Sequence, residues 1–457
     1  MSKKKPNVIV FFTDQQRWDT TGFHGNREGL TPNLDRMAAN GTDVHRCFTS
    51  NPVCGPARAT LQTGKYPASV GVHRNNLTLE TNHPTLAQCF NEAGYHTGYI
   101  GKWHLVKSDD VASKGAVPEE LRAGYKYWMA ANVAEFVSDS YHAVLYDNDG
   151  KEHRPAGYRV DAYTDIAVDY IEAHKDEPFF LFMSFLEPHF QNNHDNYWAP
   201  DGYSRLYADA YVPPDLRSLH GNTFQNMGGY YGMVKRLDEA YGRVLDALKS
   251  LDLLEDTIVL FTTDHGCHFK TRNSEYKRSG HESSIRLPTV LCGGIFNRGR
   301  KIQELVSLTD LPPTLLEAAG LPVPEGMQGR SIVPLLYGDA DDWADSVYVQ
   351  ISESCVGRAV RTKRWKYIVE APETALQKDL AYSPTYTEKA LYDLFADPYE
   401  LCNIIELDSY HDVKAEMRKR LLAHAKRVGE PPIEEIVEVP ERKAGQRKAD
   451  IFGKFEL

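Results

Sequence analysis

The chain has 457 residues, of which 42% are hydrophobic and 25% are charged, and its formal net charge is −11. This composition is typical of a globular protein that is large enough for more than one domain. The negative charge argues against a general nucleic-acid-binding protein, because phosphate backbones require a basic surface.

The N-terminal region resembles neither a secretory signal nor a membrane anchor. Its apolar run covers only residues 8–12 and is followed by Thr13-Asp14, which indicates a buried strand. No apolar run in the sequence reaches transmembrane length. The seven cysteines are scattered and include no CxxC pair, so a disulfide framework is not expected. These features predict a cytoplasmic protein without membrane or nucleic-acid partners.

Four apolar runs predict buried strands of an α/β sheet, at residues 8–12, 97–100, 179–185 and 258–263. Each run is followed closely by polar residues, which are Asp14, Gln15, Lys102, His104, His189, Asp264 and His265. An open α/β sheet binds its ligands beyond the carboxyl ends of its strands. We therefore expect these side chains to gather in one site, with Lys102 and His104 on one face of an extended segment.

Helical periodicity predicts helices over residues 31–41, 160–174 and 226–251. Near Trp343 the pattern changes to short antiparallel strands at 347–351, 357–362 and 365–370, followed by a helix over 413–428. We therefore expect a large α/β domain over 1–344 and an α+β subdomain over 345–430. The tail 431–457 is rich in Pro, Glu and Lys, and is either disordered or an arm of a homo-oligomer.

Two motifs carry chemical information. The first is Cys54-Gly55-Pro56-Ala57-Arg58, continued by Thr63-Gly64, where a guanidinium and a helix N-terminus would favour a thiolate. A lone cysteine is more often a buried structural residue, so the evidence lies in the whole string. The second is the segment 94–104, GYHTGYIGKWH. Together the two motifs resemble the signatures of the type I sulfatases of the alkaline phosphatase superfamily.

The resemblance implies a particular nucleophile and a particular fold. Cys54 would be oxidised to formylglycine by a formylglycine-generating or anaerobic sulfatase-maturating enzyme. Its hydrated form, a geminal diol, would attack sulfur with one hydroxyl and later expel sulfate with the other. The implied fold is alkaline-phosphatase-like, a large mixed sheet flanked by helices with a smaller C-terminal antiparallel sheet and helix.

The resemblance also implies a metal site. Asp14, Gln15, Cys54, Asp264 and His265 would hold a divalent cation, most readily Ca²⁺ given the oxygen-rich set, with Mn²⁺ or Mg²⁺ as alternatives. Family members most often have a second aspartate where this chain has Gln15, so the site has one negative charge fewer.

The remaining implied roles concern the substrate. Lys102, Lys277 and His189 would bind the transferring sulfate group, while Arg58 and His104 would steady and activate the formylglycine. The substrate contacts expected from loop position are Arg74, Asn75 and His281. Residues 105–160 give no functional prediction.

Three functions are compatible with the sequence. The first is hydrolysis of a sulfate monoester, with a carbohydrate sulfate as the expected substrate by analogy. The second is phosphonate monoester or phosphodiester hydrolysis with the same nucleophile, because those enzymes also use Asp-Gln and Asp-His metal pairs. The third is a binding protein in which Cys54 is never modified.

Overall fold

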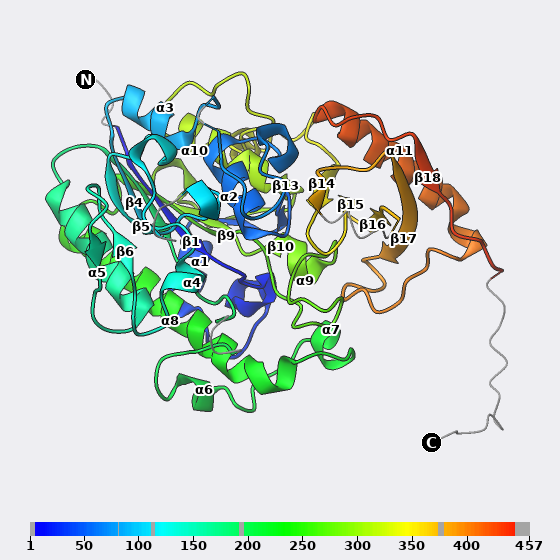
Figure 1. Cartoon of the computed structure of the whole chain (residues 1–457), viewed down its shortest axis with the longest axis horizontal. Helices are drawn as coiled ribbons and strands as arrows, with labels where there is room; N and C mark the ends of the chain where they lie inside the picture. The colour runs from blue at the N-terminus through cyan, green and yellow to red at the C-terminus, as the bar shows by residue number, and fades with distance from the viewer. Residues whose placement is uncertain (1–4, 81, 111–114, 192–195, 373–378, 444–457) are drawn as a thin grey trace.

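The computed structural model describes residues 5–80, 82–110, 115–191, 196–372 and 379–443 (Figure 1). Within these residues the largest sheet has ten strands, in the order β12-β2-β11-β9-β1-β8-β4-β5-β6-β7. Its centre is parallel and consists of β9 (Thr257–Thr263), β1 (Asn7–Thr13), β8 (Phe179–Ser184), β4 (His96–Lys102) and β5 (Tyr127–Ala131). The expected large mixed sheet is confirmed.

Helices cover both faces of this sheet, because its central strands are apolar on both sides. Along β1, Val8, Val10 and Phe12 pack into one core, whereas Ile9 and Phe11 pack into the other. The first core includes side chains of α2 (Cys54–Thr63), α3 (Leu86–Glu92) and α10 (Leu311–Ala318). The second includes those of α1 (Pro32–Asn40), α5 (Arg159–Ala173) and α8 (Thr223–Ser250). Each fully buried large apolar side chain contributes about 1.5–3 kcal/mol.

Shorter elements complete this part of the chain. The outer strands of the large sheet are β12 (Arg300–Ile302), β2 (Thr42–Val44), β11 (Val290–Cys292), β6 (Leu145–Tyr146) and β7 (Glu152–His153). A separate small sheet contains β10 (Arg286–Leu287), β3 (Cys47–Phe48) and β13 (Val306–Ser307). The short helices are α4 (Ala134–Val137), α6 (Tyr203–Leu206), α7 (Pro214–Arg217) and α9 (Glu282–Ile285). No helix among the described residues is long and apolar enough to cross a membrane.

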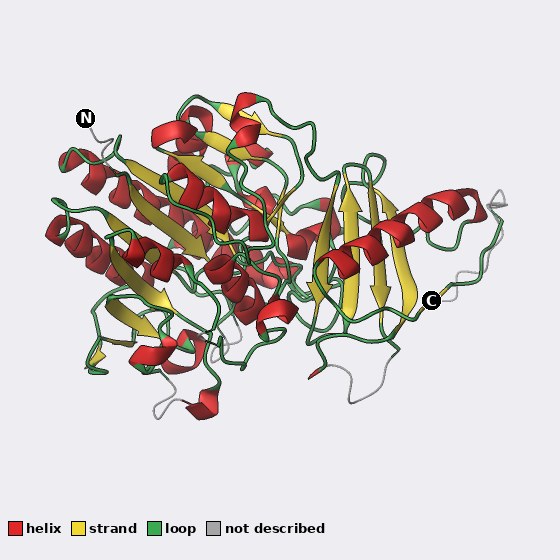
Figure 2. Cartoon of the chain, turned by 90° about the horizontal axis from the view of Figure 1, so that it is seen from above, coloured by secondary structure: helices red, strands yellow, loops and turns green. Residues whose placement is uncertain are grey.

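The C-terminal part forms a separate unit of sheet and helix, which lies beside the part that contains the large sheet (Figure 2). Strands β14 (Ser346–Ile351), β15 (Gly357–Thr362), β16 (Trp365–Glu370) and β17 (Thr385–Asp393) pair in antiparallel fashion under α11 (His411–Arg427). This confirms the expected smaller sheet and helix. Strand β18 (Glu435–Val437), in the region interpreted as a tail, pairs in parallel with β17. Residues 444–457 lie outside the described residues, and the oligomer arm stays a prediction.

The strand order explains why the polar residues meet. Strands β9, β1, β8 and β4 are consecutive neighbours in the sheet and run in parallel, so their carboxyl ends lie along one edge. At the end of β4, Gly101 has φ +108°, and a Cβ there would lie 1.9 Å from the carbonyl oxygen of Ser184 on β8. Only glycine lets these two strand ends approach so closely.

We expect Gly101→Ala to lower the free energy of unfolding by about 3 kcal/mol or more, because it combines a left-handed backbone with a clash against a neighbouring strand. Gly157→Ala is the matched control: Gly157 has φ +93° and its Cβ would meet no described atom within 4 Å. Its cost should be about 1 kcal/mol. Urea unfolding of both variants measures the difference, and equal losses would contradict the proposed close approach.

Candidate active site

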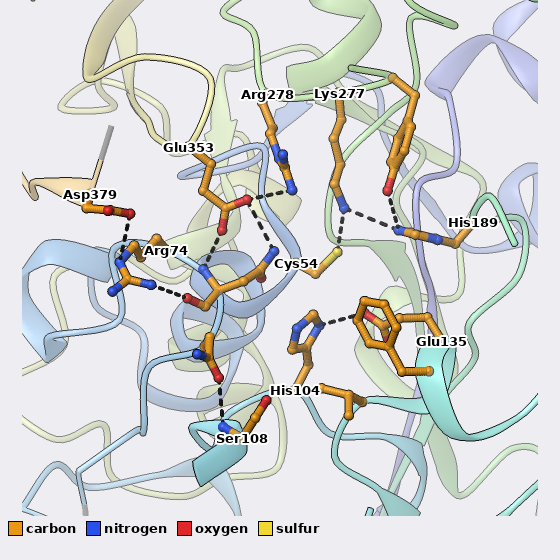
Figure 3. A pocket seen from close by; sticks show the side chains of 15 residues that line it. Cys54, Arg74, His104, Ser108, Glu135, His189, Lys277, Arg278, Glu353 and Asp379 are labelled. Atoms are coloured by element: carbon orange, nitrogen blue, oxygen red, sulfur yellow. Dashed lines mark hydrogen bonds and ion pairs between the residues drawn. The ribbon is translucent and has the colours of Figure 1, made fainter. Parts of the chain in front are cut away.

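Cys54 begins α2 and lies at the base of a cavity of about 400 Å³ (Figure 3). All ten residues of α2 are buried, and Cys54 itself is 1% exposed. Gly55 and Pro56 form the first turn of this helix. A proline in the first turn costs no helical hydrogen bond, and the turn places residue 54 at the positive end of the helix dipole.

The sulfur of Cys54 lies close to an ammonium group and an imidazole ring. Its Sγ lies 2.6 Å from the Nζ of Lys277 and 3.3 Å from the Nε2 of His265. Burial alone would raise the pKa of the Cys54 thiol, but Lys102, Lys277 and His265 outweigh it and hold that pKa well below its ordinary value. The site therefore stabilises negative charge at residue 54.

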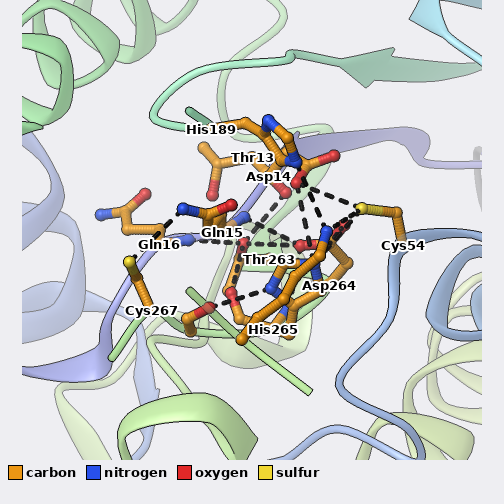
Figure 4. Close-up of polar contacts among 12 residues, drawn as sticks. Thr13, Asp14, Gln15, Gln16, Cys54, His189, Thr263, Asp264, His265 and Cys267 are labelled. Carbon is orange, nitrogen blue, oxygen red and sulfur yellow. Dashed lines mark hydrogen bonds and ion pairs between the residues drawn. The ribbon is translucent and has the colours of Figure 1, made fainter. Parts of the chain in front are cut away.

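A potential metal site lies directly beside Cys54 (Figure 4). Ligand atoms of Asp14, Cys54, Asp264 and His265 all lie within 4.8 Å of one another, and all four residues are buried. Among the described residues, the Oδ2 of Asp264 and the Oε1 of the adjacent Gln15 have no hydrogen-bond partner. Unpartnered buried oxygens beside an imidazole fit a hard divalent cation.

The charge of this cluster also fits a cation. Burial and the neighbouring Asp14 carboxylate together raise the pKa of Asp264. The pKa of Asp14 is lowered: burial and the Cys54 thiolate act to raise it, but Lys102, His189 and Arg58 outweigh them. A bound dication would relieve the repulsion between the two acids.

The side-chain amide group of Gln15 hydrogen-bonds two buried side chains. Its Nε2 donates to the hydroxyl of Tyr197 at 2.9 Å and to the Sγ of Cys267 at 3.3 Å. The backbone N–H of Gln15 donates to the Oδ1 of Asp264 at 2.9 Å, which joins the two strand ends. Gln15 is thus placed where its amide oxygen could serve as a ligand.

Arg58 and Lys102 both neutralise Asp14. The Nη2 of Arg58 donates to the Oδ2 of Asp14 at 2.8 Å, and the Nζ of Lys102 donates to the same oxygen at 2.9 Å. The Nη1 of Arg58 also donates to the carbonyl of Lys102 and to the hydroxyl of Ser184. Arg58 is not among the described residues that line the cavity, so it contacts Asp14 from outside the cavity.

Lys277 and His189 also line the cavity beside Cys54. The Nδ1 of His189 is 2.6 Å from the carbonyl of Phe190, so Nδ1 donates and Nε2 faces Lys277 at 3.4 Å. Burial lowers the pKa of His189. The pKa of Lys277 is raised because Cys54 and Asp14 outweigh the opposing effect of burial. Lys277 is therefore the charged member of this pair.

The predicted substrate contacts divide into two groups. Arg74 and Asn75 line the cavity, and the Oδ1 of Asn75 accepts from the N–H of Gly55 at 2.8 Å. His281 does not line it among the described residues; its Nε2 lies 3.2 Å from the hydroxyl of Tyr392 in the small sheet. The structure thus does not bring His281 to the predicted site.

Three acidic residues of the cavity, Glu135, Glu353 and Asp379, were missed by the sequence analysis, and the first two contact predicted site residues most closely. Glu135 on α4 lies 3.1 Å from the Nζ of Lys102 and 3.3 Å from the Nδ1 of His104. Glu353, which follows β14, accepts from the N–H of Asn75 at 2.7 Å and pairs with Arg278 at 2.6 Å. Neither residue belongs to a motif. His104 has φ 60°, so the extended segment predicted for Lys102 and His104 ends at Lys102.

Comparisons with known proteins point to one family. The sulfatase family model matches residues 6–321, and the model of the N-sulphoglucosamine sulphohydrolase C-terminal region matches residues 275–427. The ulvan-active sulfatase of Formosa agariphila is 29% identical over 434 residues, covering 91% of this chain and 80% of its own length. The N-acetylglucosamine-6-O-sulfatase of Bacteroides thetaiotaomicron is 24% identical over 498 residues, covering 92% of this chain and 86% of its own length. The structure of a Bacteroides fragilis protein described as a sulfatase superposes with a TM-score of 0.81 at 25% identity, covering 94% of this chain and 98% of that one.

We expect Arg58→Met to lower the free energy of unfolding by about 3 kcal/mol or more, because it leaves two buried acids with one cation fewer. Arg154→Met is the matched control, since it also removes an Arg–Glu pair of 2.6 Å, but one whose side chains are 69% and 41% exposed. Its cost should stay below about 1 kcal/mol. Similar urea midpoints for the two variants would contradict a structural role for Arg58.

Proposed function

The chain belongs to the sulfatase family of sulfuric ester hydrolases, and from this premise we propose that it hydrolyses a carbohydrate sulfate monoester with formylglycine at position 54 as nucleophile. The observation that carries the proposal is the position of residue 54. It lies 2.6 Å from the ammonium group of Lys277 and within 4.8 Å of the ligand atoms of Asp14, Asp264 and His265.

The chain's own residues supply charge and position. Hydrated formylglycine at position 54 would supply a geminal diol, with one hydroxyl to attack sulfur and one to expel sulfate. Asp14, Gln15, Asp264 and His265 would hold a divalent cation, with Ca²⁺ favoured over Mn²⁺ or Mg²⁺, which would supply Lewis acidity toward a sulfate oxygen. Residue 54 as a further ligand follows from its place in the same cluster.

Lys102 and Lys277 are the cations that would balance charge on the transferring group. Both are fully buried, and the pKa of Lys102 is raised because Asp14, Cys54 and Glu135 outweigh burial. Buried, fixed cations stabilise developing charge better than solvent does. His189 Nε2, 3.4 Å from Lys277 Nζ, lies where the pair could deliver a proton to the leaving oxygen.

Two observations support a sugar as the group released. The relative named N-acetylglucosamine-6-O-sulfatase acts, by that name, on a sugar sulfate. The cavity beyond residue 54 is lined by polar side chains such as Arg74, Asn75 and Glu353, which are suited to hydroxyl groups. We further propose that an enzyme that generates formylglycine acts on Cys54.

We expect Cys54→Ala and Cys54→Ser to lose essentially all turnover of an aryl sulfate while keeping the thermal unfolding temperature of the unsubstituted protein, because a modification specific for cysteine converts neither residue to formylglycine. Mass spectrometry of the active protein should show the peptide containing residue 54 lighter by about 18 Da, as the oxidation of a thiol to an aldehyde requires. Full activity of Cys54→Ala would refute the nucleophile.

We also expect kcat/KM to be higher for an aryl sulfate than for the matching phosphate monoester or phosphonate ester, because sulfate is a much weaker base and leaves residue 54 more readily. Lys102→Ala should lower kcat on the order of 10²-fold or more through lost stabilisation of the transition state. Higher kcat/KM for the phosphonate ester or a phosphodiester would replace the sulfatase proposal with the alternative hydrolase.

A further inference from the structure

Glu135 is a buried acidic residue in the cavity where we propose that the sulfate ester binds. It is 4% exposed, lines the cavity with His104 and Cys54, and comes from the four-residue helix α4. Resting on the proposed function, we propose that Glu135 is a positioning residue that acts through His104: it fixes the ring so that Nε2 is free to accept a proton from a hydroxyl at position 54.

The contacts of Glu135 define the arrangement. Its Oε1 lies 3.3 Å from the Nδ1 of His104, and Figure 3 shows the ring of His104 beside Glu135, with Cys54 above the ring in this view. The same ring lines the cavity together with Cys54 and contributes to lowering the pKa of the Cys54 thiol. The backbone N–H of His104 donates to the carbonyl of Asn132 at 2.7 Å, which fixes the residue from which the ring extends.

Glu135 remains ionised in this environment. Burial alone would raise its pKa, but Lys102, His104 and His189 lower it to about 2. Among the described residues the Nδ1 of His104 makes no hydrogen bond, and its 3.3 Å contact with the Oε1 of Glu135 is an ion-pair contact. An ionised carboxylate accepts hydrogen bonds and donates none, so its charge favours a proton on the ring nitrogen that faces it. A neutral imidazole with its proton on Nδ1 has its lone pair on Nε2.

This arrangement allows one defined proton transfer. The proton leaves a hydroxyl at position 54 and binds to the Nε2 of His104, while the electron pair of the O–H bond stays on that oxygen. The positive charge formed on the imidazole is stabilised by Glu135, which itself takes up no proton. The same division of roles among carboxylate, histidine and hydroxyl operates in hydrolases with a catalytic triad.

A simpler role for Glu135 would be to neutralise Lys102, whose Nζ lies 3.1 Å from the same carboxylate oxygen. Lys102 already donates to Asp14 at 2.9 Å, so it has a carboxylate partner without Glu135. The two roles differ in one respect. A residue that acts through His104 has no effect once His104 is removed, whereas a partner of Lys102 keeps its effect.

A double-mutant cycle separates these roles. We expect Glu135→Gln to lower kcat for an aryl sulfate on the order of 10²-fold with KM nearly unchanged, and to change kcat less than about twofold in the His104→Ala background. Glu353→Gln, an acid of the same cavity bound to Asn75 and Arg278, is the matched control. Its effect should be the same with and without His104. An equal loss for Glu135→Gln in both backgrounds would overturn the proposal.

A second readout does not depend on activity. In ¹⁵N-histidine-labelled protein, the signals absent from His104→Ala identify His104, and their shifts report which nitrogen is protonated. We expect an Nδ1–H tautomer that changes to Nε2–H or a mixture in Glu135→Gln, and is retained in Glu135→Asp. An Nε2–H tautomer in the unsubstituted protein would overturn the proposal. If no sulfate ester is hydrolysed, the proposed function fails, while the tautomer still tests the role of Glu135.

Discussion

The repulsion between two buried carboxylates, Asp14 and Asp264, is the constraint on which the site depends. They stand at the ends of adjacent parallel strands, and each is fully buried. Asp14 is balanced by Arg58 and Lys102, whereas the Oδ1 of Asp264 accepts the backbone N–H groups of Gln15 and His265. Burying two like charges is costly unless cations compensate them, so Arg58, Lys102 and a divalent cation bound by the two acids would act as one electrostatic arrangement.

The sequence predicted the sheet and most of the site because that information is local. Each central strand is a short apolar run, and the chemically active residue follows it within a few positions, as Asp14 follows β1 and Asp264 follows β9. The strand order that brings these ends together is not local, but a parallel α/β sheet gathers its carboxyl ends at one edge. The fold class was therefore predictable and is confirmed.

What the sequence did not predict depends on contacts between distant segments. Glu135 lies on a helix too short to show periodicity, and Glu353 reaches the cavity from the C-terminal sheet. His281, which follows Lys277 in the sequence, was expected to contact the substrate. Arg278 between them has φ 70°, and after it the chain turns so that His281 packs against Tyr392. Proximity in sequence is a poor guide across such a turn.

The binding of a divalent cation tests the account most directly, because it would explain both the two buried acids and the unpartnered oxygens beside them. Calorimetric titration of the metal-stripped protein with Ca²⁺ should show one ion per chain, and Asp264→Asn should weaken that binding by about tenfold or more. The absence of binding of Ca²⁺, Mn²⁺ and Mg²⁺, or binding unchanged in Asp264→Asn, would contradict the account.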